Sequence, residues 1–428
     1  MVVNANVRLT ALLTGLCLLG PATPAASAAT DVPGQLIVTF ADGAGRGARA
    51  EAHRDAEAAL TERIGPIDVD VVTVPAGGVE EALERYAADP TVERVEPDPV
   101  VRALGDPCAG APCPLPDDPE LPRQWGLQND AGTLHRYPLL GDSDIDAPFA
   151  WQLGAGEAST TLAVLDSGVD LDHEDLTGQL RLSANFTRSE TVDDRHGHGT
   201  HVAGIAAARA GNGVGVAGVA PGVSLISGKV LADDGNGSCS SISAGIVWAV
   251  DNGADVINLS VGGADGCSAQ AAAVKRADDR GVLVVAAAGN GGSESASYPA
   301  AYPSVMAVAA TDEQDALASF SNRGSWVDIA APGAHVFSTQ PNHESRTKAR
   351  NYGSRSGTSM AAPHVAGAAA LLWSLVGDLN GDGRRSDEVR ARLEGYADAV
   401  PGAGRTLGAG RLNLCNAAAG ERTACTLR

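Results

Sequence analysis

Short apolar runs recur along the chain from about residue 124, and each has the length of a strand rather than of a long helix. They lie at 160–166, 223–231, 254–260, 281–290 and 304–312. Between some of these runs, residues 240–253 and 268–281 have the apolar spacing of helices. Runs that are apolar throughout are typical of parallel strands buried on both faces. The alternation therefore predicts a doubly wound α/β domain, with a mostly parallel sheet flanked by helices, over residues 124–428.

The first hundred residues follow a different pattern, in which short strands and charged helices alternate. Strands are predicted at 35–40 and 69–74, helices at 46–64 and 79–89, and a last extended piece at 92–101. Together they predict a small α+β domain over residues 29–103. Residues 104–123 are dense in proline and aspartate, which is typical of a linker or an arm.

The N-terminus has the composition of an export signal. Arg8 precedes an apolar run at 11–20, and residues 26–28 form a small-residue cleavage site. The run is too short for a transmembrane helix, and no later stretch reaches the required length without glycine, serine or charge. We therefore expect residues 1–28 to be a signal peptide and the protein to be secreted into the extracellular medium.

Charge and cysteine content narrow the picture further. The 428 residues include 31 Lys and Arg against 52 Asp and Glu, a net charge of −21. This charge repels nucleic acids and anionic membranes, so we expect neither as a partner, and we expect a monomer. Beyond the signal six cysteines remain, and an even number in an exported chain indicates disulfides, although six allow 15 pairings. They are Cys108, Cys113, Cys239, Cys267, Cys415 and Cys425.

Polar side chains follow the predicted strands where ligands bind in such sheets. The apolar runs end on Asp166, Ser260 and Asn290, and the carboxyl ends of parallel strands meet at one edge. Ser359 stands at the start of an apolar, alanine-rich helix. The unpaired N–H groups at a helix start can stabilise negative charge. A carboxylate, an amide and a hydroxyl are therefore expected at one site.

Three histidines lie within six positions, in the stretch RHGHGTHVAG. His196, His198 and His201 have spacings that suit either a zinc site or proton transfer. The spacing alone does not distinguish these interpretations.

Three motifs together resemble a known family. They are DSGVD at 166–170, HGTHVAG at 198–204 and GTSMAAPHVAG at 357–367. With aspartate, histidine and serine in this order, residues from about 124 to about 418 resemble the subtilisin-like serine proteases (subtilases). The last motif is close to unique to that family. The resemblance implies peptide hydrolysis without an organic cofactor.

The resemblance assigns a role to each of four residues. Ser359 is the nucleophile, His198 is the general base, and Asp166 holds the imidazole in the correct tautomer. Asn290 and the backbone N–H of Ser359 stabilise the oxyanion. His196 and His201 then become neighbours of the base, one exposed on the loop and one packed in the following helix.

Subtilases bind the substrate as an added β-strand, and the resemblance places that strand between two segments. Main-chain pairing accepts most sequences, which implies a broad endopeptidase. Small walls in the pocket for the residue before the cut (P1) favour a large apolar side chain there. The positions implied are Gly235, Asn236, Gly237, Ser260, Val261, Gly262, Ala288 and Gly289.

Calcium is implied as a structural ion. The family's tight site falls on Asp175 and Asn212, with carbonyls near Val214 and Val216. A second candidate, residues 378–388, begins with the D-x-N-x-D-G pattern of an EF-type loop. Its twelfth position is Val389 where an acid is expected, so a solvated acidic turn explains it equally well.

The front domain, residues 29–103, resembles the inhibitory propeptides of secreted subtilases. The resemblance implies self-cleavage after folding, at a point between about Arg102 and Pro116. It also brings Cys239 and Cys267 to opposite sides of the outer substrate pocket and so implies that they pair. The pairs Cys108–Cys113 and Cys415–Cys425 rest on proximity in sequence and are interchangeable.

Two other functions are compatible with parts of the sequence. One is a catalytically silent subtilase fold that acts as a binding module, against which all four active-site residues stand intact. The other is a metal-dependent hydrolase that uses the histidine cluster.

Overall fold

The computed structural model describes residues 31–41, 43–64, 69–75, 77–99, 115–129, 143–401 and 403–422. The predicted signal peptide lies outside these residues. The chain divides into two compact units, Met1–Gly105 and Asp106–Arg428. None of the described helices combines the length and apolar character needed to cross a bilayer.

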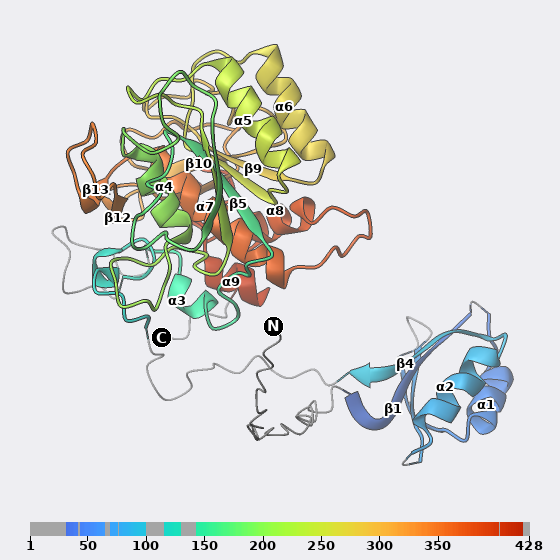
Figure 1. Cartoon of the computed structure of the whole chain (residues 1–428). Helices are drawn as coiled ribbons and strands as arrows, with labels where there is room; N and C mark the ends of the chain where they lie inside the picture. Colours follow the sequence, from blue (N-terminus) through green and yellow to red (C-terminus); the bar gives the residue numbers. More distant parts are fainter. Residues whose placement is uncertain are drawn as a thin grey trace, which may run out of the picture. The chain divides into compact units, whose positions relative to one another are not determined.

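The first unit is an antiparallel sheet of order β2-β3-β1-β4 with two helices on one face (Figure 1). Leu36 and Val38 of the sheet pack with Ala52 and Tyr86 of the helices. The elements are β1 (Asp31–Phe40), α1 (Arg46–Asp55), β2 (Ala59–Ile64), β3 (Val69–Thr73), α2 (Val79–Ala88) and β4 (Val92–Pro99).

The prediction of one helix over 46–64 is wrong. Helix α1 ends at Asp55, and Glu57 adopts a left-handed φ of 53° that turns the chain back. The next residues form β2, which pairs with β3 from Ala59 opposite Thr73 to Ile64 opposite Val69. Pairing with the edge of β3 thus outweighed the local helical pattern.

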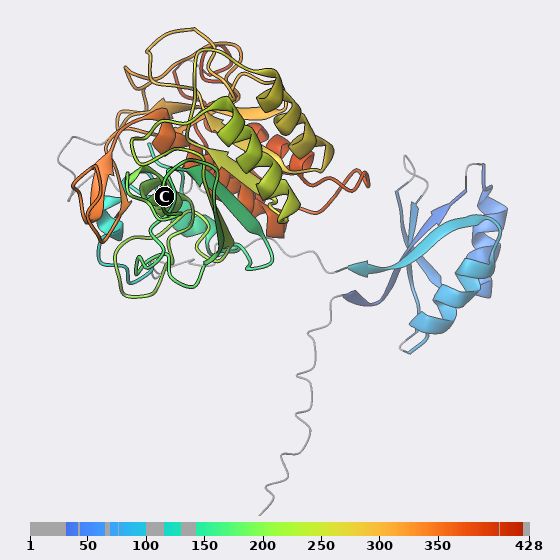
Figure 2. The ribbon, with the colours of Figure 1, turned by 45° about the horizontal axis from the view of Figure 1, so that its top comes forward.

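The second unit contains a seven-stranded parallel sheet of order β11-β10-β9-β8-β5-β7-β6 (Figures 1 and 2). This sheet confirms the predicted fold class. Its strands are β5 (Thr161–Asp166), β6 (Leu180–Asn185), β7 (Ser224–Lys229), β8 (Val256–Leu259), β9 (Leu283–Ala287), β10 (Val305–Thr311) and β11 (Ile329–Pro332).

Helices cover both faces of this sheet, and successive residues of a central strand supply both cores. Leu162 packs with α4 and α7, whereas Ala163 packs on the other face with α5 and α6. Helix α7 is apolar on all sides because it is buried in the larger core. The helices are α3 (Ala147–Ala150), α4 (His198–Ala207), α5 (Cys239–Asp251), α6 (Ser268–Asp279), α7 (Thr358–Leu375), α8 (Ser386–Gly395) and α9 (Leu414–Ala419).

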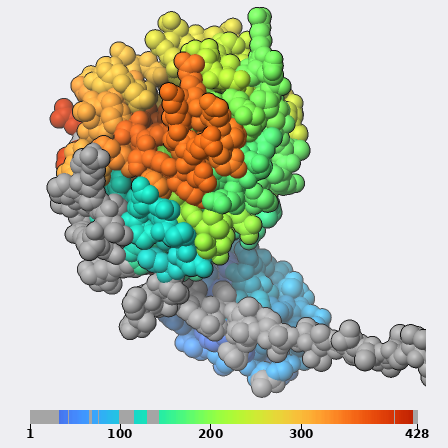
Figure 3. Space-filling model, turned by 60° about the vertical axis from the view of Figure 1, so that its left-hand side comes forward, coloured from blue at the N-terminus to red at the C-terminus, as the bar shows by residue number. Residues whose placement is uncertain are grey.

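Two smaller features complete the unit. The hairpin of β12 (Val336–Gln340) and β13 (Asn351–Arg355) lies at the surface beside the residues that precede α4 (Figure 3). Residues 115–123, which include the short 3₁₀ turn Leu121–Arg123, pack on this unit rather than forming a free linker. The N–H of Glu120 donates to the carbonyl of Gly215 at 2.8 Å.

Candidate active site

The four predicted catalytic residues come from the carboxyl ends of strands and the starts of helices. Asp166 ends β5, and Asn290 lies three residues beyond β9. His198 is the first residue of α4, and Ser359 is the second residue of α7. His198, Asn290 and Ser359 line one cavity of about 420 Å³. The topology therefore brings together groups that are up to 193 positions apart (359 − 166).

His198 is hydrogen-bonded to a buried carboxylate. Its Nδ1 lies 2.7 Å from Oδ1 of Asp166, whose side chain is fully buried, whereas the His198 side chain is 18% exposed. A carboxylate accepts hydrogen bonds, so Nδ1 carries the proton and Nε2 of the neutral ring is an acceptor. Burial alone would lower the pKa of His198, but the charge and hydrogen bond of Asp166 outweigh it and raise that pKa.

Asn290 is held in one amide orientation. Its Oδ1 accepts hydrogen bonds from the N–H and hydroxyl of Thr358, at 2.8 and 3.0 Å. A backbone N–H can only donate, so the oxygen must face Thr358. Within the described part of the chain, Nδ2 of Asn290 has no acceptor. It is therefore free to donate to a ligand in the cavity.

Ser359 makes a reciprocal contact with Ser260. Its hydroxyl donates to the Ser260 carbonyl at 3.1 Å, and the Ser260 hydroxyl donates to the Ser359 carbonyl at 2.8 Å. These bonds hold the start of α7 against the residue that follows β8. Ser359 thus lines the same cavity as His198, and its hydroxyl is directed to the Ser260 carbonyl.

Comparison with known proteins identifies the family to which the chain belongs. Residues 157–410 match the model of the subtilase family, and residues 21–98 match that of the fervidolysin N-terminal prodomain. The chain belongs to the subtilase family. Subtilases are serine endopeptidases, so this subtilase is a peptide hydrolase with an N-terminal prodomain.

Individual relatives agree with this assignment. A "thermophilic serine proteinase" of Bacillus sp. (strain AK1) is 36% identical over 90% of this chain and 87% of its own. "Thermitase" of Thermoactinomyces vulgaris is 43% identical over 65% of this chain and 94% of its own. A solved protease of Pseudoalteromonas arctica PAMC 21717 is 31% identical, with a TM-score of 0.63 over 72% of this chain and 99% of its own.

The predicted substrate-binding positions of this subtilase face the same cavity, with one exception. Gly235, Asn236, Gly237, Ser260, Val261, Gly262 and Gly289 line it. The side chain of Ala288 does not; it is fully buried in a separate core with Val327 and Leu407, and Ala287 lines the cavity instead. Successive residues after a strand point to opposite sides, which places one of the two alanines in each environment.

Sequence reasoning missed several residues of the cavity wall. Two glycines allow neighbouring side chains to lie against the backbone of this wall. A Cβ on Gly235, whose φ is +82°, would lie 2.6 Å from Nε2 of His196. A Cβ on Gly262 would lie 2.7 Å from Oγ of Ser297. No motif in the sequence marks these contacts. The further lining residues are His196, Leu231, Ile242, Ser297 and Thr358.

The three clustered histidines have separate environments. His196 is half-buried rather than exposed as expected, and burial lowers its pKa. His201 is fully buried in α4, where burial holds its pKa well below the usual range and its Nε2 lies 3.0 Å from the Gly353 carbonyl. In the described regions, one cluster of at least three His, Cys, Asp or Glu side chains has the spacing of a metal site, and it contains none of these three histidines. It consists of Asp170, Asp193 and His343.

The predicted calcium residues meet, together with an acid that the sequence did not point to. Oδ1 of Asp175 accepts from the Asn212 amide at 2.9 Å, and its Oδ2 accepts from the Val216 N–H at 2.8 Å. Asp118 accepts from the Gly211 N–H at 2.7 Å on the same loop. Burial raises the pKa of both Asp118 and Asp175, and neither forms an ion pair with a described Lys or Arg.

The second candidate loop, residues 378–388, is closed by its own polar groups. Asp378 accepts from the N–H groups of Gly381 and Gly383, both at 2.8 Å. Glu388, and not the fully buried Val389, reaches back to the N–H of Leu379 at 3.2 Å. These contacts are compatible with a calcium loop and with an acidic turn, so both interpretations stand.

Cys239 and Cys267 are joined in a disulfide, as expected. Their Cα atoms are 6.6 Å apart, and the bridge connects the starts of α5 and α6. Cys415 is buried in α9. Cys108, Cys113 and Cys425 lie outside the described residues.

Proposed function

We propose that this subtilase is a secreted serine endopeptidase of broad specificity. Asp166, His198 and Ser359 carry the reaction, and Asn290 binds the oxyanion. The observation that carries the proposal is the bond from Nδ1 of His198 to the buried Asp166 at 2.7 Å. It leaves Nε2 as a base in the cavity that Ser359 and Asn290 also line.

The reaction follows from these positions. The Ser359 hydroxyl turns from the Ser260 carbonyl to Nε2 of His198, which takes its proton as Oγ attacks the peptide carbonyl. Nδ2 of Asn290 and the backbone N–H of Ser359 donate to the oxyanion. His198 then protonates the departing amine, and a water molecule activated by His198 hydrolyses the acyl-enzyme.

The substrate lies as an extended strand between Gly235–Gly237 and Ser260–Gly262. The two segments line the cavity, and main-chain pairing with a substrate strand is insensitive to side chains. The small walls at Gly262, Ala287 and Gly289 leave room for a large apolar P1 residue.

The prodomain inhibits the enzyme until its removal. Within residues 29–103, the described part forms antiparallel strands and helices of a separate unit, which supports a role as a folding aid and inhibitor. The cut falls between Arg102 and Pro116, a segment that lies almost entirely outside the described residues. The mature enzyme acts as an extracellular monomer, with Cys108–Cys113 and Cys415–Cys425 as further disulfides.

Calcium stabilises the mature enzyme. Asp175, Asp118 and Asn212, with the carbonyls of Val214 and Val216, supply the hard oxygen donors that calcium prefers. Two buried carboxylates without a Lys or Arg partner fit a divalent cation, because it offsets their charge. Its contribution is stability, since proton transfer remains with His198.

Labelling with a fluorophosphonate probe tests the proposal. The wild type is expected to be labelled at Ser359 and to digest casein, and labelling should persist in EDTA. Ser359→Ala should lose both properties. A folded wild type that is neither labelled nor active would indicate a silent binding module, and labelling that requires metal would indicate a metal-dependent hydrolase.

A further inference from the structure

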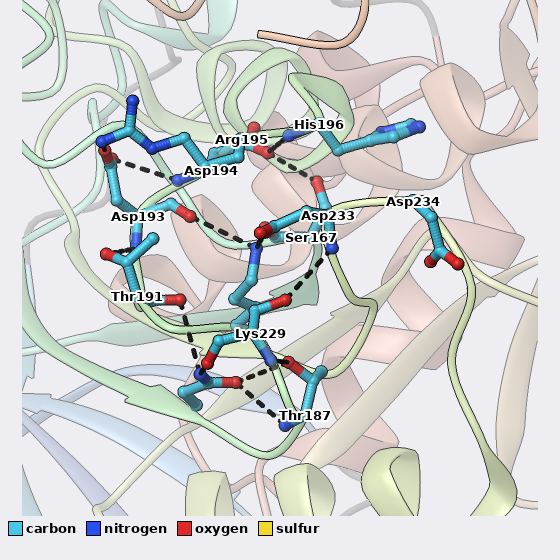
Figure 4. Close-up of polar contacts among 12 residues, drawn as sticks. Ser167, Thr187, Thr191, Asp193, Asp194, Arg195, His196, Lys229, Asp233 and Asp234 are labelled. Atoms are coloured by element: carbon cyan, nitrogen blue, oxygen red, sulfur yellow. Dashed lines mark hydrogen bonds and ion pairs between the residues drawn. The ribbon is translucent and has the colours of Figure 1, made fainter.

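Lys229, the last residue of β7, is a fully buried lysine outside the proposed catalytic set. Removing an ammonium group from water is costly unless its donors are satisfied. Its Nζ donates to the Ser167 carbonyl at 2.5 Å and to the Asp193 carbonyl at 3.2 Å, and it forms an ion pair with Oδ1 of Asp233 at 2.9 Å (Figure 4). Two of the three N–H donors thus have carbonyl acceptors, and the Asp233 carboxylate offsets the charge of the ammonium group, although its Oδ1 accepts no hydrogen bond within the described residues.

The first partner belongs to the segment that carries Asp166. Ser167 follows Asp166 directly, and its N–H donates to Oδ1 of Asp166 at 2.7 Å. Lys229 also lies opposite Asp166 in the β5–β7 register, and the next N–H, that of Val230, donates to the Asp166 carbonyl at 2.8 Å. Lys229 and its neighbour thus hold the end of β5 from two directions.

The second partner, Asp193, lies in the loop between β6 and α4, five residues before His198. Asp194, next to Asp193, is fully buried and accepts from the N–H groups of Gly197 at 2.7 Å and Thr200 at 2.9 Å. It therefore caps the start of α4, where His198 stands. The Ser167 hydroxyl also donates to Asp194 at 2.8 Å, which ties this loop to the first segment.

The third partner belongs to the loop that lines the substrate. Asp233 lies just before Gly235–Gly237, in a turn closed by bonds of 2.8 Å from the Ala232 N–H to Asn236 and from the Gly235 N–H to Ala232. The Asp233 side chain is 44% exposed, but the oxygen that meets Lys229 is buried. The ion pair therefore anchors the inner end of this loop.

We propose that Lys229 is a positioning residue of the active site. Its ammonium group contacts the end of β5, the loop before α4 and the substrate-lining loop, and so fixes the positions of these three segments relative to one another. Lys229 does not line the cavity, so it acts through these segments and not on the substrate. This inference rests on the proposed function, because it assumes that Asp166 and His198 work together.

Two ion pairs of equal spacing allow a matched test. Lys229–Asp233 and Lys275–Asp279 are both i,i+4 pairs, but the Lys275 side chain is 72% exposed. Lys229→Met and Lys275→Met each remove one ammonium group. We expect Lys229→Met to lower kcat by about 10- to 100-fold, measured well below its Tm, because small displacements of catalytic groups cost that much. Lys275→Met should match the wild type.

Asp233→Asn separates the substrate loop from the catalytic pair. It leaves both carbonyl bonds of Lys229 in place, so KM for an extended peptide should rise about fivefold while kcat stays within about twofold. Asp279→Asn is the control and should change neither. This split between kcat and KM would not result from a general loss of stability. It also decides the question if Lys229→Met fails to fold.

The outcomes separate this inference from the proposed function. If the wild type is not labelled by fluorophosphonate at Ser359, the proposed function fails first. If the wild type is labelled and active, but Lys229→Met and Asp233→Asn both match their controls in kcat and KM, Lys229 has only a structural role and the inference is overturned. An unchanged KM in Asp233→Asn likewise overturns it when Lys229→Met does not fold.

Discussion

Individual side chains in the candidate site are oriented by partners that leave one functional atom free. Nδ1 of His198 is held by Asp166, which leaves Nε2 facing the cavity. Oδ1 of Asn290 is held by Thr358, which leaves Nδ2. In both residues the hydrogen-bonding atom that does not act is fixed by a neighbour. Orientation in advance is what electrostatic stabilisation of a transition state requires.

The pH dependence of activity should follow His198. The base must be neutral, so kcat/KM rises as pH increases through the pKa of His198, which Asp166 raises. Asp166→Asn removes that carboxylate, so the rise should move to lower pH, while kcat falls by about 10⁴-fold because the tautomer is lost. A pH profile of both enzymes measures this. A rise that stays at the same pH would show that Asp166 does not set the pKa.

Asn290→Ala should lower kcat by about 10²- to 10³-fold with little change in KM, since the amide acts only on the transition state. Asn290→Asp is the companion variant, because it keeps the acceptor for Thr358 and lacks the donor. Steady-state kinetics on one peptide measure both. A raised KM with an unchanged kcat would assign Asn290 to substrate binding instead.

At the scale of elements, the site depends on connections between loops that the sheet delivers to one edge. The disulfide joins the starts of α5 and α6, which follow two segments that line the cavity, 235–237 and 260–262. The loop that contains Gly211 and Asn212 is held from two sides. Asn212 donates to Asp175, and the Gly211 N–H donates to Asp118, which precedes η2 (Leu121–Arg123). Each connection restrains a loop outside the regular strands.

Cys239→Ser with Cys267→Ser should lower stability by roughly 3–4 kcal/mol on the chain-entropy estimate, because the bridge closes a 28-residue separation. Serine suits position 267, since Sγ of Cys267 accepts from the Gln270 N–H and a hydroxyl preserves that cap. Thermal unfolding measures the loss. The preference for side chains away from the cut should change while kcat on a short peptide is retained, and an unchanged preference would separate the bridge from the substrate pocket.

Calcium removal should act on stability before catalysis. Excess EDTA is expected to lower Tm, whereas kcat at low temperature should stay near its initial value. Asp175→Asn is the control, because its Tm should respond little to EDTA once the site is impaired. A wild-type Tm that does not change in EDTA would remove calcium from the proposal.

At the scale of the whole molecule, the chain combines a prodomain with a catalytic unit that has its own core. The prodomain match at 21–98 and the subtilase match at 157–410 are separated by the proline- and aspartate-rich stretch. Exposed linkers between domains are preferred sites of proteolytic cleavage. The arrangement favours a precursor that matures by its own activity.

Ser359→Ala should therefore accumulate as the full precursor in a host that lacks proteases. The mass of the secreted product measures this. Added wild-type enzyme should cut the variant within residues 102–116, which shows that the junction remains accessible. Normal maturation of Ser359→Ala on its own would contradict self-processing.

The sequence by itself determined the parallel sheet, five of its seven strands and the four candidate catalytic residues. Strands buried on both faces need continuous apolar runs, and functional groups at strand ends lie within short local motifs. Both kinds of information are contained in neighbouring residues.

Tertiary structure alone decided the remaining features, because each depends on segments far apart in the chain. The six residues of β2 have a helical sequence pattern but form a strand that pairs with β3. Strand β6 has only half-buried or exposed side chains, so it was recognisable only from its pairing with β7. Asp118 contacts the loop around Asn212 across up to 94 positions, and Lys229 contacts Ser167, Asp193 and Asp233 across up to 62 positions. No local pattern encodes such contacts, since their free energy arises only when packing removes these polar groups from water.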